Sequence, residues 1–177
     1  MTETMRNGPE QIEQELDHIA RVAGAMVDGD VCRRIVTARA LDYMFKTDPH
    51  DRFLAGDNYD VNDAEFNVTK KTLIRLARLA PFPCDVNLWM PIRGHPGKIQ
   101  AVVRNVLDLS QFYVFGAMYQ DMFPPMQTVL ETGRRITVKE KPGLISVLSP
   151  VYDSLGDIVG LVEAVSHTTR GSYEGKP

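Results

Sequence analysis

The chain has 177 residues, 44% of them hydrophobic, and a formal net charge of −3 at pH 7. This length suits one sizeable hydrophobic core, so we expect a single domain over residues 1–177, with its core at about 12–166 and polar ends at 1–10 and 168–177. The basic residues are scattered rather than gathered into a stripe, which argues against a nucleic-acid partner. No window approaches the roughly 20 continuous apolar residues that span a bilayer.

The first expected element is a helix over residues 11–27. Its apolar residues recur at alternating steps of four and three, namely Ile12, Leu16, Ile19, Ala23 and Met26. Such a seam is typical of the core-facing stripe of one helix, and it would equally suit pairing with the same helix of a second chain. The Asp-Gly-Asp run at 28–30 then interrupts the helix.

The next stretch is expected to contain two further helices separated by a loop. A shorter helix is expected over 31–43, and the run 46–63, rich in Asp, Asn, Gly and Pro, is expected to be an exposed loop. Asp63 is placed to cap the following helix, because a carboxylate there can accept bonds from free first-turn amides. Pro81 and Pro83 stop that helix.

Strand signals dominate the second half of the chain. Residues 85–92 and 98–107 predict a hairpin around the turn at 93–97. A looser aromatic segment and then a helix are expected within 110–132, followed by a short strand at 134–139.

The strongest signal is a hairpin over residues 144–166, with its turn at 153–156. Asp153 is expected to bond the turn backbone two residues on. Because strands follow one another without βαβ alternation, we predict an α+β fold with an antiparallel sheet and helices mainly on one face.

The sequence carries no recognisable catalytic, metal or phosphate-binding motif. The four histidines fall on different expected elements, and Cys32 and Cys84 have no neighbours at ligand spacing. We therefore expect no catalytic residues, no metal and no cofactor, and do not expect an enzyme; a haem sensor is the least favoured reading. Both cysteines are expected as buried thiols, although a disulfide in an oxidising compartment stays open.

Two candidate ligand-binding residues lie in the first expected hairpin. Trp89 is the only tryptophan, and Arg104 lies in the partner strand. Both could face a pocket, where Arg104 would offer a carboxylate its charge and fork geometry. The alternative is a core tryptophan and a surface arginine.

Four further candidates carry hydroxyl groups. Tyr113 and Tyr119 belong to the aromatic segment, where a phenol offers a small ligand an apolar wall and a polar handle, or simply packs under a loop. Ser146 and Ser149 interrupt an otherwise apolar strand, where each hydroxyl needs a backbone, water or ligand partner.

These features, in order, resemble the Cache family of PAS-like bacterial sensor domains, in its single-Cache form. The resemblance is carried by the helix at 11–27 with its break at 28–30, the strand Asp85-Val86-Asn87-Leu88-Trp89-Met90, and the closing hairpin with Ser149-Pro150-Val151-Tyr152-Asp153 and a Gly at 156 and 160. It implies a five-stranded antiparallel sheet with a long N-terminal helix behind it. A small-ligand pocket would lie between the sheet and the loops of the aromatic segment.

The resemblance also implies a function in signal transduction. The domain would bind a small polar or anionic metabolite and relay binding through its N-terminal helix, as a homodimer, to an output domain outside this chain: a kinase, chemoreceptor or cyclase. The amino-acid-binding pattern of the family is not intact here, so an amino-acid ligand does not transfer. The alternative is a ligand-free dimerisation module with the same fold.

Two locations follow from the same reasoning. The polar start of the chain has neither the basic end nor the apolar stretch of a secretion signal. The expectation is an extracytoplasmic, periplasmic domain if the chain is excised from a membrane receptor, and a cytoplasmic protein if it is complete.

Overall fold

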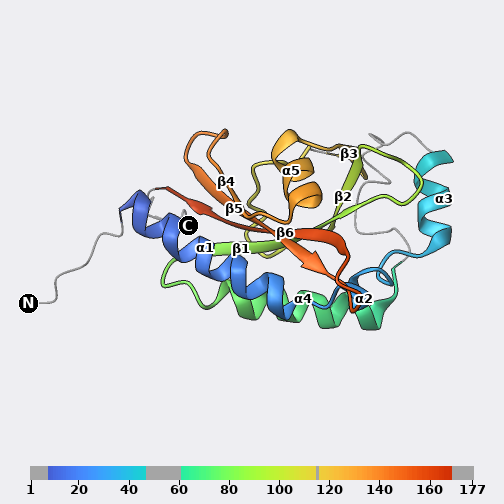
Figure 1. The fold of residues 1–177 in the computed structure, drawn as a ribbon, viewed down its shortest axis with the longest axis horizontal. Helices are drawn as coiled ribbons and strands as arrows, with labels where there is room; N and C mark the ends of the chain where they lie inside the picture. The colour runs from blue at the N-terminus through green and yellow to red at the C-terminus, as the bar shows by residue number, and fades with distance from the viewer. Residues whose placement is uncertain (1–7, 47–60, 115, 169–177) are drawn as a thin grey trace, which may run out of the picture.

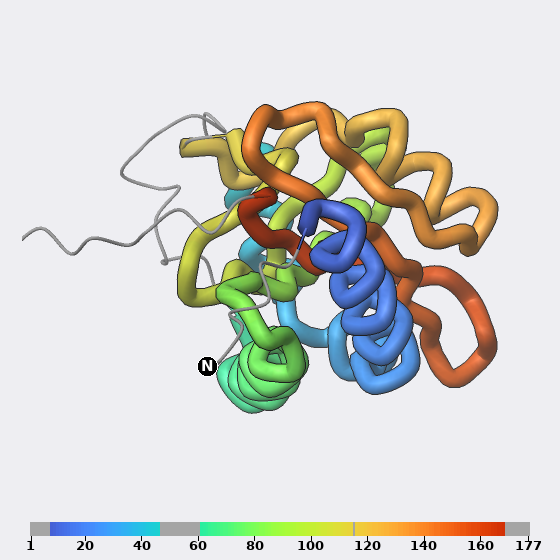
Figure 2. The backbone as a smooth tube through the Cα atoms, turned by 90° about the vertical axis from the view of Figure 1, so that its left-hand side faces the viewer, coloured from blue at the N-terminus to red at the C-terminus, as the bar shows by residue number. Residues whose placement is uncertain are grey.

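The computed structural model describes residues 8–46, 61–114 and 116–168. A six-stranded antiparallel sheet with the order β3-β2-β1-β6-β5-β4 forms its centre. In Figures 1 and 2, α1 and α4 lie below this sheet and α5 lies above it. The elements, in chain order, are α1 (Pro9–Met26), α2 (Gly29–Cys32), α3 (Ala38–Lys46), α4 (Asp63–Ala77), β1 (Cys84–Pro91), β2 (Lys98–Val103), β3 (Gln120–Asp121), α5 (Pro124–Thr132), β4 (Ile136–Val138), β5 (Leu144–Tyr152) and β6 (Ile158–His167).

The α+β class and the antiparallel sheet are confirmed, but the expected number of five strands is wrong. The additional strand, β3, has two residues and pairs with the start of β2. An ion pair of 2.6 Å between Lys98 Nζ and Asp121 Oδ1 accompanies this pairing. Two residues are too few to produce an alternating pattern, so β3 leaves no signal in the sequence.

The helix expected at 11–27 is α1, and its seam faces the sheet. Ile12, Leu16, Ile19 and Ala23 are buried and α1 packs on β5 and β6, whereas Met26 is 63% exposed. The prediction that Met26 continues the core-facing stripe is therefore wrong. The rest of the stripe already contributes to the hydrophobic core within one chain.

The prediction of one continuous helix over 31–43 is wrong. This region contains two helices, α2 and α3, because the backbone between them forms an antiparallel bridge between Val36 and Val61. Asp28 caps α2 by accepting bonds from the amides of Asp30 and Val31. Of the expected loop 46–63, residues 47–60 lie outside the described residues.

The remaining boundaries shift by a few residues. Asn62, not Asp63, occupies the N-cap position of α4, and its side-chain amide donates to the Arg34 carbonyl instead of capping the helix. The strand expected over 98–107 ends at Val103, because the backbone beyond it bonds to side chains of β1.

Both expected hairpins are present. In the second, Asp153 Oδ1 accepts from the amide of Leu155 at 3.0 Å, as the sequence predicted, and also from the amide of Asp157 at 2.9 Å. Its other oxygen forms an ion pair of 2.9 Å with Arg33, which ties the turn to α2.

The sheet separates two hydrophobic cores. Under α1 and α4 lie the inward residues of β1, β5 and β6, such as Leu88, Val147 and Val162. On the other face, Trp89 and Leu161 pack with residues of α5. None of the described helices is long and apolar enough to cross a membrane.

Candidate functional site

A buried carboxylate stands at the centre of the sheet face opposite α1. Glu163 of β6 is fully buried and accepts four hydrogen bonds. Its donors are Trp89 Nε1 at 3.0 Å, Ser110 Oγ at 2.7 Å, the Gln111 amide at 2.9 Å and Ser146 Oγ at 2.7 Å. Burial raises the pKa of Glu163, and these hydrogen bonds partly offset the increase.

Two further side chains of β1 bind the segment that follows β2. Asp85 accepts from the amides of Leu107 at 3.1 Å and Leu109 at 3.0 Å, and burial raises its pKa. Asn87 accepts from the Asn105 amide at 3.0 Å and donates to the Leu109 carbonyl at 2.8 Å. With Glu163, these residues hold the segment 105–112 against the sheet by backbone bonds.

This network accounts for two of the predicted ligand-binding residues. Trp89 is a fully buried core residue whose indole N–H is bonded, and the Ser146 hydroxyl donates to Glu163. Ser149 lies on the opposite face of β5, against Gly24 of α1. The two residues are so close that a Cβ added at Gly24 would lie 2.9 Å from Ser149 Oγ. The structure therefore does not bring these three residues together in one pocket.

Arg104 and Tyr113 form a stack at the end of β2. The Arg104 guanidinium lies 4.5 Å from the Tyr113 ring centroid, and that ring lies 5.5 Å from Trp89. The Tyr113 hydroxyl is buried without a hydrogen-bond partner among the described residues, and burial raises its pKa. Tyr113 therefore positions Arg104 through a cation–π contact.

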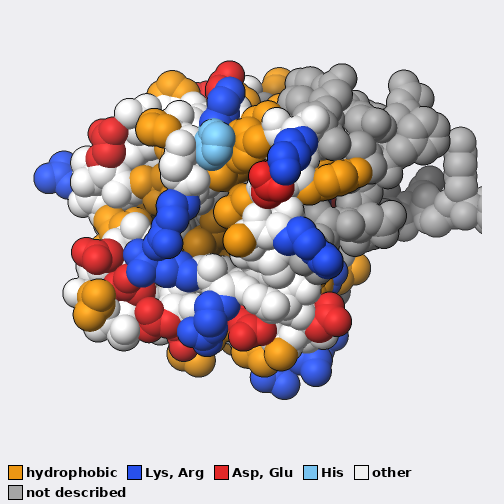
Figure 3. Space-filling view, turned by 90° about the vertical axis from the view of Figure 1, so that its right-hand side faces the viewer, with side chains coloured by type: hydrophobic (Ala, Val, Ile, Leu, Met, Phe, Trp, Pro, Cys, Tyr) orange, Lys and Arg blue, Asp and Glu red, His pale blue; other side chains and the backbone are white. Residues whose placement is uncertain are grey.

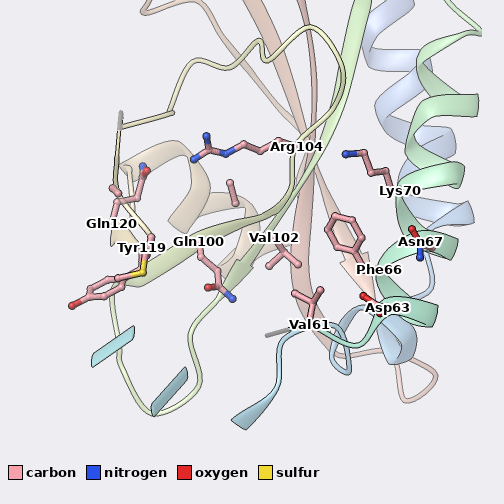
Figure 4. A pocket seen from close by; sticks show the side chains of 13 residues that line it. Val61, Asp63, Phe66, Asn67, Lys70, Gln100, Val102, Arg104, Tyr119 and Gln120 are labelled. Atoms are coloured by element: carbon pink, nitrogen blue, oxygen red, sulfur yellow. The ribbon is translucent and has the colours of Figure 1, made fainter. Parts of the chain in front are cut away.

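A cavity of about 430 Å³ lies on the α4 side of β2 (Figure 4). Arg104 and Tyr119, two of the predicted residues, line it. Its remaining walls come from α4 and the bridge residue before it, from β2, and from β3 with the segment before it. They include Val61, Asp63, Phe66, Asn67, Lys70, Gln100, Val102, Met118 and Gln120. The cavity thus brings together segments that are far apart in the sequence.

The cavity, which Asp63 also lines, contains two cations, Arg104 and Lys70, that form no ion pair with a described carboxylate. Within the described part of the chain, Arg104 contacts the Tyr113 ring, and Lys70 Nζ lies 5.6 Å from the Phe66 ring centroid, but neither forms an ion pair. Figure 3 shows Lys and Arg side chains interspersed with Asp, Glu and apolar side chains on the right-hand side of the molecule as drawn in Figure 1. The cavity can therefore offer an anion two donor groups.

A second cavity, of about 580 Å³, lies beside the first. Arg33, Met90, Ile92, Arg93 and Gln100 are among its lining residues, and Gln100 also lines the first cavity. Arg33 is already paired with a carboxylate of the β5–β6 turn. Among the described residues, two cations of the first cavity form no ion pair, against only Arg93 in the second, so the first cavity is the better candidate for an anion.

Sequence reasoning missed Lys70 and Gln100. Gln100, Val102 and Arg104 occupy alternate positions that all line one cavity, so the period of two was the available signal for Gln100. Lys70 comes from a helix remote in the sequence, and nothing in its local pattern connects it to β2.

No group of three or more His, Cys, Asp or Glu side chains in the described ranges is arranged to hold a metal ion. Both cysteines are free and buried, and burial raises the pKa of each thiol to about 12. The thiols are therefore protonated and unreactive at neutral pH.

No family model matches the chain, and no curated protein matches it.

Proposed function

We propose that this domain is the ligand-sensing input module of a bacterial signal-transduction protein, and that it binds a small anionic metabolite in the Arg104–Lys70 cavity. The observation that carries the proposal is the presence of two cations without carboxylate partners, among the described residues, in one cavity of about 430 Å³. This volume falls within the roughly 300–1,000 Å³ of ordinary ligand sites. The α+β fold with its long N-terminal helix is compatible with the Cache-like sensor architecture that the sequence resembles.

The relay runs through α4 in this proposal. Phe66 and Lys70 of α4 line the cavity, and α4 also packs against α1. A ligand that draws Lys70 toward the sheet would therefore move α4, a helix that α1 contacts. A signal requires that the ligand bind one arrangement of these helices more tightly than the other.

We expect Arg104→Ala to weaken anion binding by roughly 10- to 100-fold, because a hydrogen bond to a charged group contributes about 1.5–3 kcal/mol. Isothermal titration calorimetry with benzoate, succinate and inorganic phosphate measures this effect, and uncharged benzamide tests the need for charge. The matched control is Arg75→Ala, which removes an exposed arginine of α4 outside the cavity lining. Equal anion affinities of wild type and Arg104→Ala, or no binding of any anion by the wild type, would contradict the proposal.

A further inference from the structure

The amide oxygen of Gln100 is a buried acceptor with no hydrogen-bond partner in the described structure. Gln100 is 4% exposed and lines the Arg104–Lys70 cavity from the middle of β2. Buried polar atoms are nearly always hydrogen-bonded, because leaving one unpaired is unfavourable. A ligand with an N–H or O–H group at this point would supply the missing donor.

The cavity has two chemically different ends. Figure 4 shows Arg104 and Lys70 at one end, Val102 and Phe66 between, and Gln100 with Val61 toward the other. Gln100 and Arg104 are four residues apart, which for an extended chain separates their Cα atoms by roughly 13 Å. The cations and the Gln100 amide oxygen would therefore contact opposite ends of a bound molecule.

Charge fixes the orientation of that molecule. Asp63, in the first turn of α4, lines the cavity at the Gln100 end and disfavours an anion there. The acid group of the ligand consequently belongs beside Arg104 and Lys70, and its donor group beside Gln100. The side chains of Val102 and Phe66 suit an apolar middle.

We propose that the ligand is an elongated organic anion with an apolar middle and a hydroxyl or amino group at the end remote from its acid. In this proposal, which rests on the function proposed above, Gln100 is the residue that selects for the hydroxyl or amino group. An acid that carries its donor on the adjacent carbon is too short to address both ends. Gln100 is thus a specificity-determining residue, distinct from the cations that bind the charge.

The test compares two acids of nearly equal size, 4-hydroxybenzoate and 4-methylbenzoate, which differ by one hydrogen-bond donor. Calorimetric titration of the wild-type chain is expected to show a roughly 3- to 10-fold preference for 4-hydroxybenzoate, the value of one neutral hydrogen bond. In Gln100→Met the preference should fall to about one, because the acceptor is gone. Arg104→Ala should weaken both acids and keep their ratio.

The possible failures are distinguishable. Equal affinities of the wild type for the two acids, together with weaker binding by Arg104→Ala, would overturn the role of Gln100 and leave the anion site standing. Binding of neither acid by the wild type would overturn both proposals. Because the wild-type ratio is decisive by itself, the test does not depend on the folding of Gln100→Met, whose melting temperature should equal or exceed that of the wild type.

Discussion

Glu163→Leu is expected to lower the free energy of unfolding by roughly 2–6 kcal/mol, because each orphaned buried N–H costs about 1–3 kcal/mol. The substitution keeps the side chain of similar size but removes the acceptor of the Trp89 indole N–H and of the Gln111 amide. Neither N–H can rotate toward a new partner, whereas the hydroxyls of Ser110 and Ser146 can. Urea denaturation of both proteins measures the difference.

The same substitution should loosen the segment 105–112. Hydrogen exchange at the Gln111 amide should accelerate more than exchange in α1, because Gln111 N bonds directly to Glu163. The control is Glu140→Leu at an exposed site, which should change stability by no more than about 0.5 kcal/mol. If Glu163→Leu also lowers the free energy of unfolding by no more than about 0.5 kcal/mol, the hydrogen bonds to Glu163 do not hold the segment 105–112 against the sheet.

Glu163 also predicts a direction for the pH dependence of stability. Its pKa is raised by burial, so the folded state holds the proton more tightly than the unfolded state, where the ordinary value is 4.5. The part of the stability that comes from this tighter proton binding is therefore fully present below that value and is lost as pH rises through the folded pKa. Glu163→Leu should lack this part of the wild-type profile.

Leu16→Glu is expected to unfold the domain rather than to dissociate a dimer. Leu16 has no exposed surface and lies in the core between α1 and the sheet, so the variant loses a packed side chain and buries an unpaired carboxylate. We expect a loss of roughly 4 kcal/mol or more, a large part of the stability of a domain of this size. Thermal melting monitored by circular dichroism measures it.

Met26→Glu is the matched control, since Met26 belongs to the same predicted seam but is 63% exposed. It should melt close to the wild type. A folded, monomeric Leu16→Glu protein together with a dimeric wild type in sedimentation would instead support the alternative reading of the seam as a dimer interface. Homodimerisation through α1 stays a proposal, and it would have to use a surface other than the buried stripe.

The elements that could be predicted are those with long, regular patterns. The hairpin of β5 and β6 was predicted because apolar residues alternate before the Asp153 turn and β-branched residues are frequent after it. The helix α1 was predicted because its apolar residues recur at steps of three and four. The strand β3 could not be predicted, since its two residues are paired through the tertiary fold. The same applies to the bridge between Val36 and Val61, which divides the expected second helix.

The candidate site was predicted only in part, for a related reason. Arg104 and Tyr119 were identified by residue type, and both line the cavity. The serines were candidates because a hydroxyl in a strand needs a partner, and Trp89 because it could face a pocket from its strand. The partner of Trp89 and of Ser146 is instead Glu163, a residue distant in sequence. A carboxylate within the otherwise apolar run of β6 was the available signal in the sequence.

An NMR titration of the ¹⁵N-labelled chain with 4-hydroxybenzoate tests most directly whether an anion binds in the Arg104–Lys70 cavity, because it reports where the anion binds. We expect amide shifts that saturate and concentrate at Phe66–Lys70 and Gln100–Arg104, and that require roughly 10- to 100-fold more ligand to saturate in Arg104→Ala. Shifts confined to the neighbouring cavity around Arg33 and Arg93, or no saturable shifts, would contradict it.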